Sequence, residues 1–171
     1  MKRLPCLLVI LAAIASMGAA PQDLPPEMKI LKRFVGTWDN EIVSTTADQT
    51  LPEEQRKTVG KTRPILGGRF VQGRTFDSQG KLYNLFMYTY DPAKKVYRQW
   101  YFDSRGGAFE SVGQWDKSTQ TLTFTTDFGD GVTGVFEVHF VDKDKLEFAV
   151  VSKDADGTVQ YSIKGTSTRQ K

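Results

Sequence analysis

The chain has 171 residues, of which 39% are hydrophobic, 25% charged and 12% aromatic, and its formal charge is +3. These proportions are typical of a soluble globular domain and exclude a disordered chain, a collagen-like repeat and a polytopic membrane protein. One cysteine excludes a disulfide scaffold, and one cysteine with one histidine excludes most metal and cluster chemistry.

Residues 1–20 are expected to be a secretory signal peptide. Lys2 and Arg3 give a positive start, residues 7–15 form an apolar run too short to span a bilayer, and small residues follow. We therefore expect an exported protein, either periplasmic or secreted, whose mature chain makes no stable insertion into a membrane.

The cleavage site stays open between Ala20 and Gly18, because Pro21 follows the first of these positions. Cys6 lies before the apolar run rather than after it, so attachment of a lipid is not expected. The signal peptide carries two of the 23 basic residues, and its removal lowers the formal charge from +3 to +1. No basic run remains that could bind nucleic acid by releasing counterions, so a nucleic-acid partner is not expected.

Residues 21–35 are expected to form a proline-rich leader and then one short helix, over about 25–35. Met28, Leu31 and Phe34 recur at helical spacing with basic residues between them. A glycine follows the pattern and is typical of a helix end.

Residues 36–171 are expected to form a single β-barrel domain, because the period of hydrophobicity changes to two. The expected strands lie near 37–46, 56–63, 68–76, 81–90, 95–103, 107–115, 120–128, 132–141, 145–152 and 158–168, and 47–55 is the longest irregular loop. Short turns between them predict an up-and-down antiparallel meander. About ten such strands close naturally into an all-β barrel, which removes the sheet edges.

A two-residue turn at Arg105-Gly106 sets the expected interior face. In this register the face carries Val96, Arg98, Trp100, Phe102, Phe109, Ser111, Gly113 and Trp115, and the next hairpin extends it to Leu122 and Phe124. Arg98 is the charged residue on this apolar face. Either its stem packs on Trp100 while its head reaches the rim, or it is an interior charge that binds a carboxylate or another anion.

The strand at 132–141 gives conflicting signals. Its apolar pattern places Phe136 and Phe140 inside, whereas two-residue turns at both ends would place Glu137 and His139 inside. We favour the phenylalanine face, because burying two phenylalanines outweighs a turn preference. A bulge or a longer loop at one hairpin would reconcile the two signals.

The only histidine, His139, has three interpretations: a surface residue, a haem ligand in an apolar interior, or a general base oriented by Glu137. No G-x-S-x-G motif, zinc spacing or phosphate-binding glycine loop is present. Residues 154–157 resemble the start of a calcium loop, but no acidic residue follows to close it, so a hairpin turn is the better interpretation. No metal site is expected.

Gly36-Thr37-Trp38, at the start of the first strand, resembles the opening of lipocalins and other calycins. The resemblance is closer to one bacterial family, described only as a domain of unknown function with a calycin-like barrel. Four further segments carry it: residues 65–72 (I-L-G-G-R-F-V-Q), 90–97 (Y-D-P-A-K-K-V-Y), 100–107 and 119–123. The resemblance covers about residues 30–170 and implies a calycin-like barrel, with no established activity attached.

The lipocalin resemblance also implies roles for two residues. Trp38 would close the barrel floor, and Arg169 from the last strand would pack against it. The similar haem-binding barrels of the nitrobindin type use a histidine near the chain end, where this sequence has Thr166, Ser167 and Thr168. No cofactor is therefore expected, haem included.

Aromatic residues crowd the middle of the chain, and a barrel of about ten strands is wide enough to leave a cavity. The leading hypothesis is a barrel that binds a small apolar or amphipathic ligand, through Tyr88, Arg98, Trp100, Phe109, Trp115 and Phe124. One alternative is an envelope protein-interaction or structural module with a filled core. Another is an enzyme that uses Glu137 and His139, with both residues facing inward.

Overall fold

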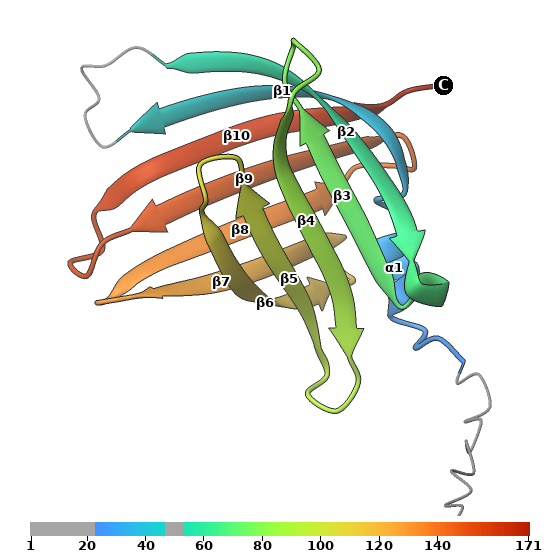
Figure 1. Cartoon of the computed structure of the whole chain (residues 1–171). Helices are drawn as coiled ribbons and strands as arrows, with labels where there is room; N and C mark the ends of the chain where they lie inside the picture. Colours follow the sequence, from blue (N-terminus) through green and yellow to red (C-terminus); the bar gives the residue numbers. More distant parts are fainter. Residues whose placement is uncertain (1–22, 47–52) are drawn as a thin grey trace, which may run out of the picture.

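The structure, a computed structural model, describes residues 23–46 and 53–171. It contains one short helix, one 3-10 turn and ten strands (Figure 1). The elements are α1 (Met28–Lys32), β1 (Gly36–Thr46), β2 (Glu54–Ile65), η1 (Leu66–Gly68), β3 (Phe70–Phe76), β4 (Leu82–Asp91), β5 (Val96–Asp103), β6 (Ala108–Asp116), β7 (Thr121–Gly129), β8 (Val132–Phe140), β9 (Lys145–Lys153) and β10 (Val159–Arg169). The expected signal peptide and residues 47–52 of the expected loop lie outside the described residues.

The strands form a closed antiparallel barrel in which each strand pairs with its neighbours in the chain and β1 pairs with β10. The all-β fold and the up-and-down topology expected from the sequence are therefore confirmed. Closure leaves no exposed sheet edge, which would otherwise be a template for aggregation. None of the described helices is long and apolar enough to cross a bilayer.

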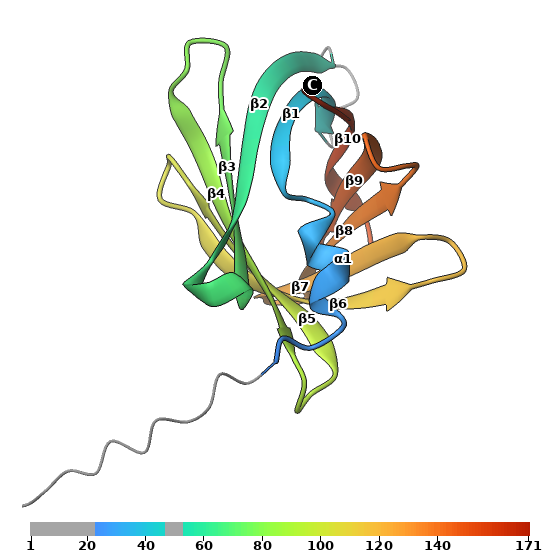
Figure 2. The ribbon, with the colours of Figure 1, turned by 90° about the vertical axis from the view of Figure 1, so that its right-hand side faces the viewer.

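The helix α1 lies at one end of the barrel, which we call the floor (Figure 2). It is shorter than expected because the hydrogen bonds on either side of it span three residues rather than four. Met28 N–H donates to Pro25 C=O, and Phe34 N–H donates to Leu31 C=O. Met28 and Leu31 are fully enclosed, so the apolar side of the helix serves as a plug.

The buried apolar core gathers at the floor. It includes Met28, Leu31, Phe34 and Trp38 from the start of the chain, together with Leu122, Phe124, Val138, Phe140 and Leu146 from β7, β8 and β9. The other end of the barrel, the mouth, is formed by the hairpins β3–β4, β5–β6, β7–β8 and β9–β10 and by the start of β2. Because the packed core lies at the floor, it does not fill the interior of the barrel toward the mouth.

The expected interior face of β5 is wrong. The β5–β6 turn contains three residues, Ser104, Arg105 and Gly106, and Asp103 N–H donates to Gly107 C=O across it. Gly106 takes the left-handed backbone (φ +90°) that such a turn requires. One extra turn residue shifts the register by one, so all β5 side chains exchange faces.

As a result, Tyr97, Gln99, Tyr101 and Asp103 face inward, and Val96, Arg98, Trp100 and Phe102 face outward. The partner strand β6 keeps the expected orientation. Phe109, Ser111, Gly113 and Trp115 face inward, and they pair with a β7 strand that directs Leu122 and Phe124 inward.

The favoured register of β8 is confirmed. Phe136 and Phe140 face inward, and Glu137 and His139 are exposed on the outer face. A bulge at Phe128, between the pairs Asp127–Thr133 and Gly129–Val132, lets a two-residue turn coexist with this orientation. The apolar pattern therefore decides the orientation, and the bulge accommodates the turn.

Candidate functional site: a cavity inside the barrel

A cavity of about 680 Å³ lies inside the barrel and reaches toward the mouth. Its apolar wall includes Ile42, Phe86, Phe136, Phe148, Val150 and Ile163, which come from β1, β4, β8, β9 and β10. Inward side chains alternate with outward ones along each strand, so five strands can supply one continuous wall. The volume falls in the range of about 300–1,000 Å³ that small-molecule sites occupy in proteins.

A belt of small polar side chains crosses the middle of the cavity. Ser111 and Thr126 hydrogen-bond across β6 and β7, at 2.7 Å. On the opposite wall Ser167 Oγ donates to Asn40 Oδ1 at 2.6 Å, and Asn40 Nδ2 donates to Thr58 at 3.0 Å. These polar groups satisfy one another, so the belt gives the interior polarity without leaving buried groups unpaired.

Tyr88 and Gln99 form a deeper polar contact. Gln99 Nε2 donates to the Tyr88 hydroxyl oxygen at 3.4 Å, and both residues are buried. Burial raises the pKa of Tyr88 well above its usual range, so the phenol is neutral at physiological pH. The stacked rings of Phe34, Tyr88 and Phe86 connect the floor core to the cavity wall.

Charged and polar side chains line the mouth end of the cavity. Arg56 of β2 lies with its guanidinium carbon 4.8 Å from the centre of the Tyr83 ring. Asn84 and Tyr101 lie on the neighbouring wall, and burial raises the pKa of Tyr101 to about 12. Two buried side-chain atoms here have no hydrogen-bond partner: Arg56 Nε and Asn84 Oδ1. Unpartnered buried polar atoms are uncommon and costly in folded proteins.

Of the residues expected to bind a ligand, the structure brings two to the cavity wall. Tyr88 and Phe109 line the cavity. Phe124 and Trp115 point inward but belong to the packed interior: Phe124 is completely buried and packs against Tyr88 and Phe136, and Trp115 packs against Phe140.

The other two, Arg98 and Trp100, are on the outer face, and their expected place in the interior is wrong. Arg98 Nε donates to Glu110 at 2.7 Å, and its guanidinium covers the Trp100 ring at 4.7 Å. Both contacts are those of a surface side chain whose charge is paired in water.

Sequence reasoning missed Arg56, Asn84 and Tyr101. Tyr101 was hidden by the register error, and the Asp103-x-x-Gly-Gly sequence was the available signal for the longer turn. Asp103 Oδ1 accepts hydrogen bonds from the N–H groups of Arg105 and Gly107, as an aspartate does at the start of such a loop. Arg56 lies on a strand without clear alternation of polar and apolar residues, and no sequence signal distinguished it from a surface arginine.

Glu137 and His139 lie in an open groove on the outer surface of the barrel, together with Glu147 of β9 and Lys164 of β10. The enzyme hypothesis requires both residues to face inward, and this requirement is not met. Among the described residues, no group of three or more histidine, cysteine or acidic residues could hold a metal ion.

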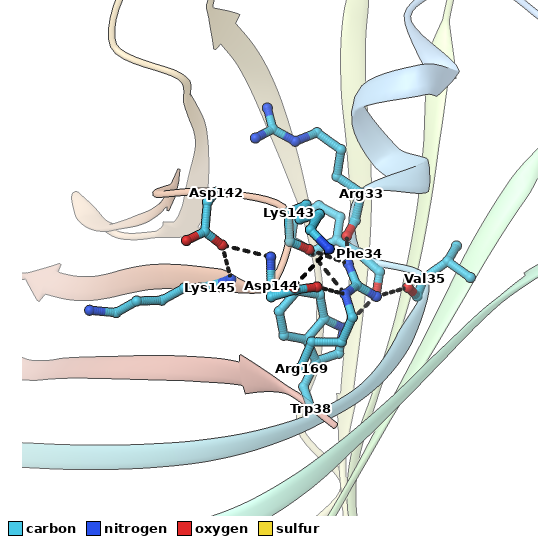
Figure 3. A network of polar contacts seen from close by, with 9 residues as sticks. All are labelled: Arg33, Phe34, Val35, Trp38, Asp142, Lys143, Asp144, Lys145 and Arg169. Atoms are coloured by element: carbon cyan, nitrogen blue, oxygen red, sulfur yellow. Dashed lines mark hydrogen bonds and ion pairs between the residues drawn. The ribbon is translucent and has the colours of Figure 1, made fainter. Parts of the chain in front are cut away.

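At the floor, Arg169 packs its guanidinium over the Trp38 ring, 4.1 Å from the ring centre (Figure 3). The same guanidinium donates to the carbonyl oxygens of Val35, Arg33 and Lys143. The Trp38 indole N–H donates to Phe34 C=O at 2.7 Å. The network ties the first and last strands to the segment that follows α1.

The comparisons with known proteins concern the fold. The family described as proteins of unknown function, DUF1579, matches residues 24–169. Two solved structures share the calycin-like barrel. An S-type phycobiliprotein lyase (CPES) from Guillardia theta is 13% identical over 84% of this chain and 92% of its own, with a TM-score of 0.59. Rv2717c from M. tuberculosis is 13% identical over 87% of this chain and 100% of its own, with a TM-score of 0.60. No curated protein matches the sequence.

Proposed function

We propose that this protein, which belongs to the DUF1579 family, binds one small amphipathic molecule inside its barrel. The observation that carries this proposal is the cavity of about 680 Å³, which has an apolar wall on one side and polar groups at its mouth. A chain under selection only for stability gains by filling such a space, because an empty cavity loses contacts that its lining could make.

The cavity also weighs against the alternative of a module with a filled core. The interior is packed at the floor and open toward the mouth, so the barrel has room for a molecule that the packed core does not occupy. The phycobiliprotein lyase with the same fold supports this idea only by analogy, because fold alone does not determine function.

The protein is further proposed to act outside the cytoplasm. The support is the positively charged start, the short apolar run and the small residues within residues 1–20. A ligand that reaches the barrel there would come from the periplasm or from the medium.

Binding can be tested with N-phenyl-1-naphthylamine, a neutral apolar probe whose fluorescence rises when it leaves water. The change is Val150→Trp, which places a large ring on the cavity wall at a β9 position that faces inward. We expect the wild type to bind the probe and this variant to bind it at least about tenfold more weakly, a loss of about 1.4 kcal/mol.

Val151→Trp is the matched control, because Val151 is the next residue on β9 and faces outward. It should leave binding unchanged. Far-UV circular dichroism of both variants confirms that the barrel is intact. Equal probe affinity of the wild type and Val150→Trp would place the probe elsewhere, and no binding by the wild type would contradict the proposal itself.

A further inference from the structure

The mouth end of the cavity has a cationic group with an open hydrogen-bonding position. Arg56 Nε is buried without a hydrogen-bond partner. None of the ion pairs formed by the described residues involves Arg56, although six other arginine or lysine residues and their acidic partners form such pairs. A guanidinium carries its N–H donors in a fixed, planar fork. A buried donor that has no partner in the protein is suited to an acceptor atom of a bound ligand.

Neither of the two acidic residues that line this cavity, Glu54 and Asp103, forms an ion pair with Arg56. Asp103, at the mouth end of β5, pairs with Arg105 at 3.3 Å and accepts hydrogen bonds from Gly107 N–H and Arg105 N–H. These hydrogen bonds lower the pKa of the Asp103 carboxyl, so it is ionised and satisfied within its own loop. Glu54, two residues from Arg56 on the same strand, is exposed and forms no ion pair with it, although its charge favours the protonated guanidinium and helps to raise the pKa of Arg56.

The surroundings of Arg56 are aromatic and polar. The Tyr83 ring lies against the guanidinium, and the Tyr83 side chain also forms a hydrogen bond with it. Tyr161 lies near enough for the Arg56 charge to oppose the increase in the Tyr161 pKa that burial causes. Burial has the larger effect, and the Tyr161 pKa remains raised, so its hydroxyl is a neutral group at physiological pH.

On this basis, and resting on the proposed function, we propose that the ligand is an amphipathic carboxylic acid whose carboxylate binds the Arg56 guanidinium at the mouth end of the cavity. Its apolar body then lies against the wall formed by Phe136, Phe148 and Ile163. The unpartnered Asn84 Oδ1 at the same end is a hydrogen-bond acceptor, so it fits a donor group of the ligand, such as a hydroxyl, and not the carboxylate itself.

A single negative charge fits this place better than a dianion. One guanidinium faces the cavity without a carboxylate partner, and Glu54 and Asp103 also line the mouth. A phosphate monoester would bring about two negative charges close to both carboxylates at neutral pH. A carboxylate matches the planar fork of arginine with two oxygens and one charge.

The test uses cis-parinaric acid, a slender fluorescent carboxylic acid, and its methyl ester. The two probes share one apolar body and differ in charge. We expect the wild type to bind the acid about tenfold or more tightly than the ester, because only the acid offers a charged acceptor to the Arg56 guanidinium. Arg56→Gln should reduce the affinity for the acid to that for the ester and leave the ester unchanged.

Two further variants make the result specific. Arg98→Gln removes an arginine from the outer face and should leave the preference for the acid intact. Arg56→Lys keeps the charge but loses the fork, and should keep part of the preference. Binding of the ester to each variant shows that its cavity is folded.

Failures of the two proposals are distinguishable. Equal affinity of the wild type for acid and ester, or an Arg56→Gln variant that still prefers the acid, would overturn the carboxylate assignment and leave the cavity proposal standing. Failure of the wild type to bind the acid, the ester and the neutral naphthylamine would overturn both.

Discussion

Replacing Phe124 with alanine is expected to lower the free energy of unfolding by about 4 kcal/mol, since truncating a buried phenylalanine typically costs about 3–5 kcal/mol. The Phe124 side chain is completely buried. Its ring packs on Tyr88 at 5.9 Å and on Phe136 at 6.1 Å. It also covers Gly113 so closely that a Cβ there would lie 2.6 Å from the ring. The tightness of this contact leaves the neighbours little freedom to collapse into the space.

Phe128→Ala is the matched control for this prediction. Phe128 lies on the same strand near the mouth and is 48% exposed. Its truncation should cost less than about 1 kcal/mol, as substitutions outside a packed core usually do. Urea unfolding followed by circular dichroism measures both. Equal small losses would mean that Phe124 faces an open space and belongs to the ligand cavity instead of the core.

Replacing Arg169 with alanine is expected to cost about 3 kcal/mol of stability, because a partly buried cation–π contact and several charge-assisted hydrogen bonds are lost together. The guanidinium serves three backbone carbonyl groups and the Trp38 ring, and Arg169 Nε lies 3.3 Å from Asp144 Oδ1. Its loss leaves the segment between α1 and β1 without its tie to β10.

Arg98→Ala is the control for Arg169, because it also removes an arginine that covers a tryptophan. The ion pair between Arg98 and Glu110 is on the surface, where such pairs contribute about 0–1 kcal/mol. Arg169→Lys should recover little, since an ammonium cannot reproduce the planar fork. If thermal and urea unfolding showed the same loss for Arg169→Ala and Arg98→Ala, the floor network would have no special stabilising role.

The fold could be predicted from sequence because its signals are local and repeated. Most of the ten strands and the β8 orientation follow from period-two hydrophobicity, and burial of Phe136 and Phe140 favours that orientation strongly enough to decide between two turn geometries. A signal that depends on many residues tolerates an error in any one of them.

The candidate site was harder to predict because it depends on single register decisions. One additional residue in the β5–β6 turn moves Tyr101 into the barrel and Trp100 out of it. Arg98 then becomes a surface residue, and the arginine proposed to bind the ligand is Arg56, on a strand that pairs with β1 and β3. Which arginine faces inward depends on closure of the whole barrel, and the residues around Arg56 do not specify that closure.

The most direct measurement of the central proposal is the position of the bound probe. In nuclear magnetic resonance, intermolecular Overhauser effects between N-phenyl-1-naphthylamine and labelled methyl groups report contacts within a few ångströms. We expect effects to Val150 and Ile163, whose side chains line the cavity, and none to Val112, which is exposed on the outer face. Effects to Val112 without effects to Val150 and Ile163 would contradict binding inside the barrel.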